Sequence, residues 1–292
     1  MTFNQGGSFE GGRVKSRRGG AAAAGGGVGL IGIVGFLIFQ FTGVDLGPAL
    51  SQAQQGSGEQ QQETTVGTCT AEQANTDRAC RLSATVQSLD AYWAPVLAEA
   101  GVQLAQPDVV EFTGATTSAC GQASSSTGPF YCPPDQAIYL DLTFFDLLQS
   151  RFGASDGPLA EMYVTAHEYG HHVQNITGVM NEADRSASGA SSDSVKVELQ
   201  ADCYAGMWVG AAATTVDPDT GTRFLEEVTA AQLADALSAA EAVGDDHIQA
   251  ASGGQVDPHT WTHGSSEQRQ QWFTTGYEQG SLAACDTFAS DF

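Results

Sequence analysis

The residues of this chain best suited to chemistry lie in the segment His167-Glu168-Tyr169-Gly170-His171. On an α-helix, two histidines four residues apart lie about 40° from each other around the axis, so both imidazoles can reach one ion. Zinc binds such a pair, and a glutamate between the histidines can act as general base for a zinc-activated water. Because this short match also occurs by chance, other segments must support it. The segment predicts one catalytic zinc ion, with His167 and His171 as ligands and Glu168 as base.

A helix is expected around this segment. Pro158 suits a first helical turn, and Gly178 is typical of a helix end. Between them, apolar residues recur near helical spacing and would bury one side of the helix: Leu159, Met162, Tyr163, Ala166, Val173 and Ile176. The histidine pair would therefore lie on a half-buried helix.

A catalytic zinc ion takes three protein ligands and keeps one position open for water. Glu198 is the best third ligand, because the 27 residues after His171 allow one helix to end and a second to return beside it. Asp202 lies on the same face and can accept the outer N–H of a ligand histidine. In an acidic protein both carboxylates could instead line a solvated face. The apolar residues that follow, Cys203 and Trp208 among them, favour a buried helix whose carboxylate needs a partner.

His263 lies just before a helix expected to start at Ser265. A histidine that donates a hydrogen bond can stabilise the oxyanion of peptide hydrolysis, so His263 is the candidate electrophile. A histidine at a helix start is otherwise a cap or a surface group. Arg269 is expected to hold a carboxylate of the site or of the substrate. His172 points about 100° away from His171 and is expected behind the ligands or on the surface.

The N-terminal part of the chain has a different composition. Residues 1–19 are glycine-rich and basic, which predicts a disordered cytoplasmic tail. Residues 20–41 are expected to be a transmembrane anchor, because Gly20–Phe39 carries no charge and is long enough to cross a bilayer. Lys and Arg lie only on its N-terminal side, which predicts a single-pass cell-membrane protein with an extracytoplasmic domain. A cleaved signal peptide ending near Ala53 is the alternative, and residues 42–68 are expected to be a flexible linker.

Six cysteines follow the apolar run, which suggests disulfides in an oxidising compartment. Fifteen pairings of six cysteines are possible. Proximity in sequence favours Cys69 with Cys80 and Cys120 with Cys132, which leaves Cys203 to pair with Cys285. Cys203 lies close to the candidate ligands, so a role as metal ligand or nucleophile is the competing interpretation.

Residues 69–292 are expected to form the zinc metallopeptidase domain. Gln136–Leu142 alternates in polarity and predicts a strand, whose free edge, by analogy with zincins, would pair with an extended peptide. Amphipathic helices are expected at 82–97, 193–209, 229–243 and 265–280. The predicted fold class is α+β and mainly α-helical, a zincin-like domain with a small β-sheet, preceded by one transmembrane helix.

Four segments in order resemble the bacterial neutral zinc metallopeptidase family of YpfJ-like proteins: Gly128–Pro133, His167–Gln174, Val197–Gly206 and His263–Arg269. The resemblance implies a membrane-anchored zinc peptidase with His167, His171 and Glu198 as ligands and Glu168 as base. The acidic helix and the late histidine and arginine are also similar to membrane zinc peptidases of the CAAX-processing type. That similarity supports the roles given above to these residues.

The sequence therefore predicts an extracytoplasmic zinc metallopeptidase that acts on peptides or proteins. The net charge of −23 repels nucleic acid and argues against it as a partner. A catalytically silent, zinc-stabilised binding module of the cell envelope is the main alternative, and an amidase acting on cell-wall peptides is a third. The sequence does not address the oligomeric state.

Overall fold

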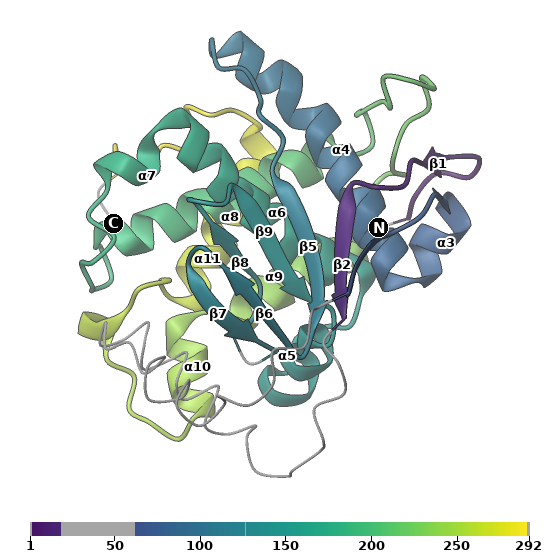
Figure 1. The fold of residues 1–292 in the computed structure, drawn as a ribbon. Helices are drawn as coiled ribbons and strands as arrows, with labels where there is room; N and C mark the ends of the chain where they lie inside the picture. Colours follow the sequence, from purple (N-terminus) through teal and green to yellow (C-terminus); the bar gives the residue numbers. More distant parts are fainter. Residues whose placement is uncertain (1, 19–61, 126, 291–292) are drawn as a thin grey trace.

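The computed structural model describes residues 2–18, 62–125 and 127–290. A five-stranded sheet faces the viewer in Figure 1, and the long helices α6 (Pro158–Thr177) and α8 (Asp193–Ala211) lie behind it with α9 (Ala230–Ala242) and α11 (Ser266–Gln279). Helix α6 contacts strands β8 and β9 as well as α8. The other elements are β1 (Ser8–Phe9), β2 (Val14–Arg18), β3 (Gln62–Thr65), β4 (Cys69–Thr70), α3 (Ala71–Thr76), α4 (Arg78–Glu99), β5 (Asp108–Thr113), β6 (Ala115–Ser118), β7 (Gly121–Ser124), β8 (Phe130–Cys132), β9 (Ala137–Asp141), α5 (Phe144–Phe152), α7 (Val179–Glu182), α10 (Asp245–Ala251) and the 3-10 helix η1 (Pro258–Thr260).

The strand order in the larger sheet is β3-β2-β5-β9-β8. Strands β2 and β9 run parallel to β5, whereas β3 and β8 run antiparallel to their neighbours. Val109, Ile138 and Leu140 are fully buried on β5 and β9. Strands covered on both faces need such apolar residues, which explains the composition of this part of the chain.

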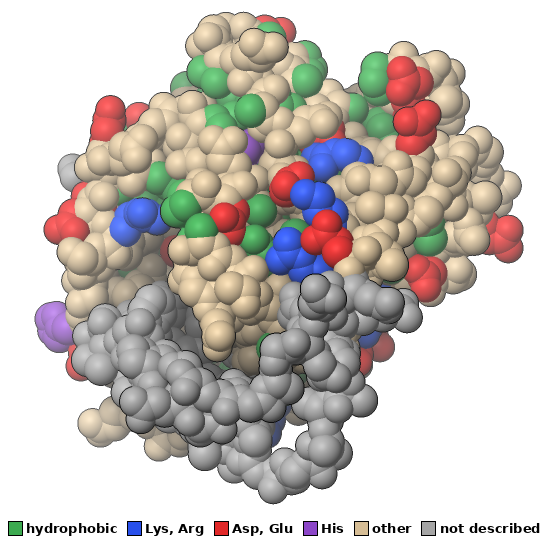
Figure 2. All heavy atoms as spheres, viewed as in Figure 1, with side chains coloured by type: hydrophobic (Ala, Val, Ile, Leu, Met, Phe, Trp, Pro, Cys, Tyr) green, Lys and Arg blue, Asp and Glu red, His purple; other side chains and the backbone are tan. Residues whose placement is uncertain are grey.

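The N-terminal residues are part of this domain, so the prediction of a disordered tail over residues 1–19 was wrong. Strand β2 lies between β3 and β5. Its alternate residues Val14 and Ser16 are buried. Lys15 and Arg17 form ion pairs of 2.7 and 2.9 Å with acidic side chains of neighbouring strands. Basic and acidic side chains accordingly lie next to one another over the middle of the sheet face in Figure 2.

The predicted fold class was also wrong in its transmembrane component. Among the residues that the structure describes, no helix has both the length and the apolar character needed to cross a bilayer. The expected span, residues 20–41, and most of the linker at 42–68 lie outside the described residues. Strands β2 and β3 are hydrogen-bonded to each other.

Strand β9 matches the strand expected at 136–142, but it has no free edge. It pairs with β5 on one side and with β8 on the other. A tight turn accounts for the second pairing: Gln136 has a φ of 49° and donates its N–H to the carbonyl of Pro133, which brings the two strands together. The outer strand on the α6 side is therefore β8.

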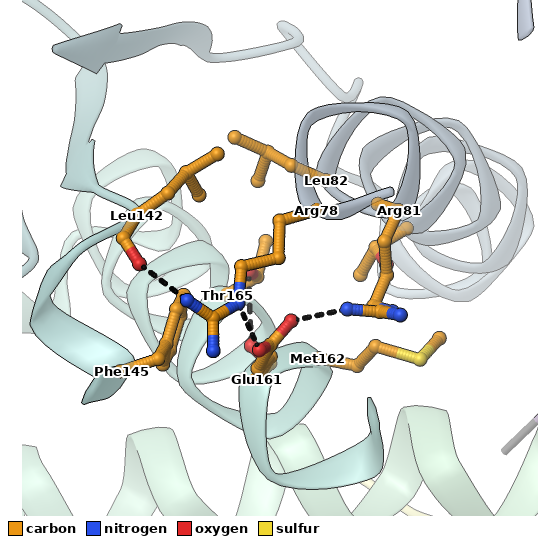
Figure 3. A pocket seen from close by; sticks show the side chains of 9 residues that line it. Arg78, Arg81, Leu82, Leu142, Phe145, Glu161, Met162 and Thr165 are labelled. Carbon is orange, nitrogen blue, oxygen red and sulfur yellow. Dashed lines mark hydrogen bonds and ion pairs between the residues drawn. The ribbon is translucent and has the colours of Figure 1, made fainter. Parts of the chain in front are cut away.

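The first turn of α6 is fixed to α4 by charged side chains. Figure 3 shows Glu161 of α6 between Arg78 and Arg81 of α4, where these side chains line a cavity. The volume of this cavity is about 10 Å³. Arg78 Nε lies 2.6 Å from Glu161 Oε1, and Arg78 also donates to Asp146 of α5 at 2.7 Å. A cavity of this size holds at most about one water molecule. These contacts therefore anchor the helix and leave no room for a substrate.

Glycines allow α8 to lie against α6 and α11. A Cβ atom on Gly170 of α6 would meet the backbone of Ala201 at 3.1 Å, and one on Gly276 of α11 would lie 1.9 Å from the carbonyl oxygen of Cys203. Such short separations show backbones in direct contact. The close approach lets side chains of all three helices reach one point.

The structure contains the two disulfides favoured by sequence proximity, Cys69–Cys80 and Cys120–Cys132, and the remaining pair, Cys203–Cys285. No described cysteine is free. Cys203 is thus a bridge between α8 and the C-terminal segment, which excludes the alternative role as ligand or nucleophile.

Candidate metal centre

Helices α6 and α8 supply the candidate ligands. Pro158 occupies the first turn of α6, and the helix ends at Gly178 with a left-handed φ of 92°, as the sequence predicted. The histidine pair lies between these ends, where α6 contacts α8. Ligand atoms of His167, His171 and Glu198 all lie within 4.8 Å of one another.

The geometry fits a tetrahedral zinc site. The Nε2 atom of His167 lies 3.2 Å from Glu198 Oε2, and that of His171 lies 3.4 Å from Glu198 Oε1. Ligand atoms at about 2.0–2.2 Å from a tetrahedral zinc ion lie about 3.3–3.6 Å from one another. The Glu198 side chain keeps 19% of its surface exposed, so the donor set is open to solvent on one side.

The outer nitrogens of the two histidines also fit a metal. The Nδ1 atom of His167 faces Asp202 Oδ1 at 2.7 Å, and that of His171 faces Gln174 Oε1 at 2.8 Å. Both partners are acceptors, so each Nδ1 carries a proton. Metal binding requires neutral imidazoles, so on binding a metal each ring would lose the proton of Nε2 and present that lone pair to the ion beside Glu198.

His167 is supported by a buried charged network. Arg269 donates to both oxygens of Asp202, at 2.8 and 3.0 Å, and the hydroxyl of Tyr163 also donates to this carboxylate. Burial opposes the ionised form of Asp202, but Arg269 and His167 hold its pKa at about 2. Burial likewise lowers the pKa of His167, but the charge of Asp202 and the hydrogen bonds to Asp202 and Glu198 together outweigh burial and raise that pKa to about 10. Asp202 and Arg269 thus lie where the sequence suggested.

Glu168 lies next to the ligands on α6 and is buried, with 7% of its surface exposed. Burial raises the pKa of this carboxyl, and the nearby His171 and His167 partly offset the rise. A carboxylate with a raised pKa is a stronger base than an exposed one. The environment of Glu168 therefore suits proton transfer.

The structure holds His263 near the ligands by means of Asp245, which sequence reasoning missed. Asp245 Oδ2 accepts the N–H groups of Thr262, His263 and Gly264 at 2.7–3.0 Å. Its other oxygen lies 3.3 Å from His263 Nδ1. Burial lowers the pKa of His263, whereas Glu198 and Asp245 raise it more strongly. Asp245 lies just after Gly244, where the sequence indicated only a helix end, so no pattern marked it.

His172 does not join the site. Of its two expected positions, behind the ligands or on the surface, the surface one is excluded because the side chain is fully buried. Its Nδ1 lies 3.0 Å from the hydroxyl of Tyr131. Its Nε2 faces the backbone carbonyl of Ala105. Burial lowers the pKa of His172 to about 4. The helix therefore directs His172 toward β8 and the loop before β5, away from the ligands.

A histidine pair on α6 and a glutamate on α8 form a group that could hold one metal ion, with the sheet beside α6. The chain belongs to the family described as "Putative neutral zinc metallopeptidase", which matches residues 4–288. That match begins before β1, so it includes the N-terminal strands. Membership implies zinc as the metal.

Two relatives illustrate the family. An uncharacterized protein of Mycobacterium tuberculosis is 50% identical over 211 residues, which cover 72% of this chain and 71% of the relative. The uncharacterized protein YpfJ of Escherichia coli K12 is 36% identical over 266 residues, which cover 89% of this chain and 86% of the relative. No solved structure matches the chain at a significant level.

Proposed function

We propose that this chain is a zinc-dependent peptidase that hydrolyses peptide bonds in peptides or proteins. The observation that supports this most strongly is the convergence of both Nε2 atoms on the carboxylate of Glu198, beside the buried Glu168. His167, His171 and Glu198 would hold one zinc ion. When bound, zinc polarises the substrate carbonyl and lowers the pKa of a water molecule.

The residues around the ligands have separate roles in this proposal. Glu168 accepts a proton from the attacking water and passes it to the leaving amine. His263, oriented by Asp245, donates a hydrogen bond to the oxyanion that develops on the carbonyl. Asp202 and Arg269 keep His167 in the tautomer whose Nε2 faces the metal position. An extended substrate could pair with the outer edge of β8, the strand beside α6.

The proposal includes an extracytoplasmic location for the domain. Three disulfides support it, because such bonds persist in oxidising compartments and are rare in the cytosol. The strongly negative net charge supports peptides or proteins over nucleic acids as substrates.

The decisive experiment compares Glu168→Gln with the wild type on a fluorescence-quenched peptide library. Gln keeps the size of the side chain but cannot take the proton, so we expect zinc content to be unchanged and cleavage to fall by about 10²–10⁴-fold. Glu182→Gln is the matched control, because this glutamate is exposed on α7 and should leave cleavage unaffected.

Two results would count against the proposal. Cleavage by Glu168→Gln at the wild-type rate would show that Glu168 is not the base. A wild-type protein that holds zinc but cleaves no peptide of the library would favour the silent zinc-stabilised binding module.

A further inference from the structure

The outer nitrogen of His171 begins a chain of buried hydrogen bonds that reaches the C-terminal segment. His171 Nδ1 lies 2.8 Å from Gln174 Oε1, and Gln174 Nε2 lies 3.0 Å from Gln200 Oε1. Gln200 Nε2 in turn lies 3.1 Å from the carbonyl oxygen of Cys285. Gln174 is fully buried and Gln200 is 4% exposed, so water does not compete for these bonds.

Two backbone carbonyls fix the direction of every bond in this chain. A carbonyl oxygen only accepts, so Gln200 must turn its NH₂ group toward Cys285, which leaves its oxygen facing Gln174. Gln174 also donates to the carbonyl of Val197 at 2.7 Å, so its NH₂ group is committed to Val197 and Gln200. The oxygen of Gln174 can then accept only from His171. His171 therefore carries a proton on Nδ1, which leaves Nε2, 3.4 Å from Glu198 Oε1, as the nitrogen available to a metal.

The end of the chain is held covalently. Cys285 is bonded to Cys203 on α8, three residues after Gln200, and both cysteines are fully buried. Thr287 adds a hydrogen bond of 2.7 Å to the carbonyl of Lys196, also on α8. The carbonyl of Cys285 therefore has a fixed place relative to Gln200.

We propose that Gln174 is the positioning residue for the metal ligand His171, and that Gln200 and the Cys203–Cys285 bond act through Gln174 to hold it in place. The inference rests on the metal site of the proposed function but not on hydrolysis. The two histidines are then supported by different means: His167 by a carboxylate and His171 by an amide chain. This gives the C-terminal disulfide a part in metal binding besides its part in stability.

The test measures the zinc dissociation constant of full-length protein by competition with a chromophoric chelator. Gln174→Leu removes the acceptor of His171, and we expect zinc binding to weaken by about 10–100-fold, the usual effect of losing such an outer partner. Gln87→Leu is the control, because Gln87 also donates to backbone carbonyls but lies on α4, and it should bind zinc like the wild type.

The double variant tests whether the residues form one chain. If Gln200 acts through Gln174, Gln200→Leu weakens zinc binding in the wild-type background and has no further effect when Gln174→Leu is present. Changing both cysteines, Cys203→Ala with Cys285→Ala, should likewise weaken zinc binding in the wild-type background and have no further effect when Gln174→Leu is present. If Gln200→Leu weakens zinc binding equally in both backgrounds, the proposal that Gln200 acts through Gln174 is wrong.

A second measurement does not depend on zinc. Nitrogen-15 NMR of the metal-free protein should show the Nδ1-protonated tautomer at His171 in the wild type and a loss of this preference in Gln174→Leu. Zinc affinity and tautomer that are both unchanged in Gln174→Leu would contradict the proposed role. A wild-type protein that binds no zinc would instead contradict the metal site itself.

Discussion

The two faces of helix α6 place the same residue type in opposite electrostatic environments. On the metal-facing side, burial lowers the pKa of His167, but Asp202 and Glu198 together overcome it and raise that pKa to about 10. On the other side, His172 meets the hydroxyl of Tyr131 and the backbone carbonyl of Ala105, and burial lowers its pKa to about 4. Position on the helix does not set the chemistry of a histidine. That chemistry is set by the groups that other segments of the chain place next to the histidine.

The second face also connects α6 to the N-terminal segment. The hydroxyl of Tyr169 donates to Asp90 of α4 at 2.7 Å. Arg13, just before β2, donates to the same carboxylate through Nε at 2.8 Å and Nη2 at 3.2 Å. This face is therefore structural, whereas the metal-facing side carries the candidate chemistry. The predictions below separate the two roles.

The largest effect on stability is expected on the metal-facing side. Asp202→Ala leaves the guanidinium of Arg269, which is 3% exposed, without its carboxylate partner. Removing one member of a buried ion pair costs about 3–5 kcal/mol. Urea unfolding of metal-free protein should show this loss, and adding Arg269→Met should recover part of it. A loss below about 1 kcal/mol would contradict a buried charged network, given the same general cost.

The next effect concerns pH and arises on the second face. Burial lowers the pKa of His172 from its ordinary value of 6.5 to about 4 in the folded protein, so below pH 6.5 the unfolded chain binds a proton that the folded chain does not. Stability is therefore lost as pH falls from 6.5 to 4, by up to about 3 kcal/mol. Unfolding free energies measured across this range should give a flatter profile for His172→Gln. Identical profiles for variant and wild type would show that His172 does not titrate in this way.

A smaller loss is expected where the N-terminal segment meets α4. Asp90→Ala removes the acceptor of both Arg13 and Tyr169, and hydrogen bonds to charged groups contribute about 1.5–3 kcal/mol. Thermal unfolding should detect this loss, whereas zinc affinity should stay that of the wild type because the ligands are not touched. A zinc affinity that falls together with stability would show that the two faces are coupled.

The smallest effect is expected for Tyr169→Phe. This change removes one hydroxyl and leaves the Arg13–Asp90 pair, so we expect a loss of about 1 kcal/mol. Calorimetry of Tyr169→Phe and Asp90→Ala, alone and combined, should show that their effects are not additive. Fully additive effects would mean that the hydroxyl does not depend on Asp90.

The structure brings together the side chains that the sequence proposed for the metal-facing side, because that information is local. His167 and His171 are four residues apart on one helix, and Glu198 and Asp202 repeat that spacing on the next. Asp245 escaped notice because its role is to accept three backbone N–H groups from a distant loop. No spacing rule describes such a contact.

The N-terminal strand was missed for a different reason. Glycines and basic residues suggested disorder, and the nearby apolar run made the same charges look like a membrane signal. A clue was present in the alternation of Val14 and Ser16 with Lys15 and Arg17, since the first two are buried and the others form ion pairs. The partners of β2 lie on β3 and β5, more than 40 residues away, so local reasoning could not find them.

The central claim is that side chains of α6 and α8 hold a single divalent ion. Metal content measured by plasma mass spectrometry tests it directly, on wild type, His167→Ala and His172→Gln purified in the presence of zinc. The account predicts one zinc per chain in the wild type and in His172→Gln, and none in His167→Ala. Zinc retained by His167→Ala, or absent from the wild type, would contradict it.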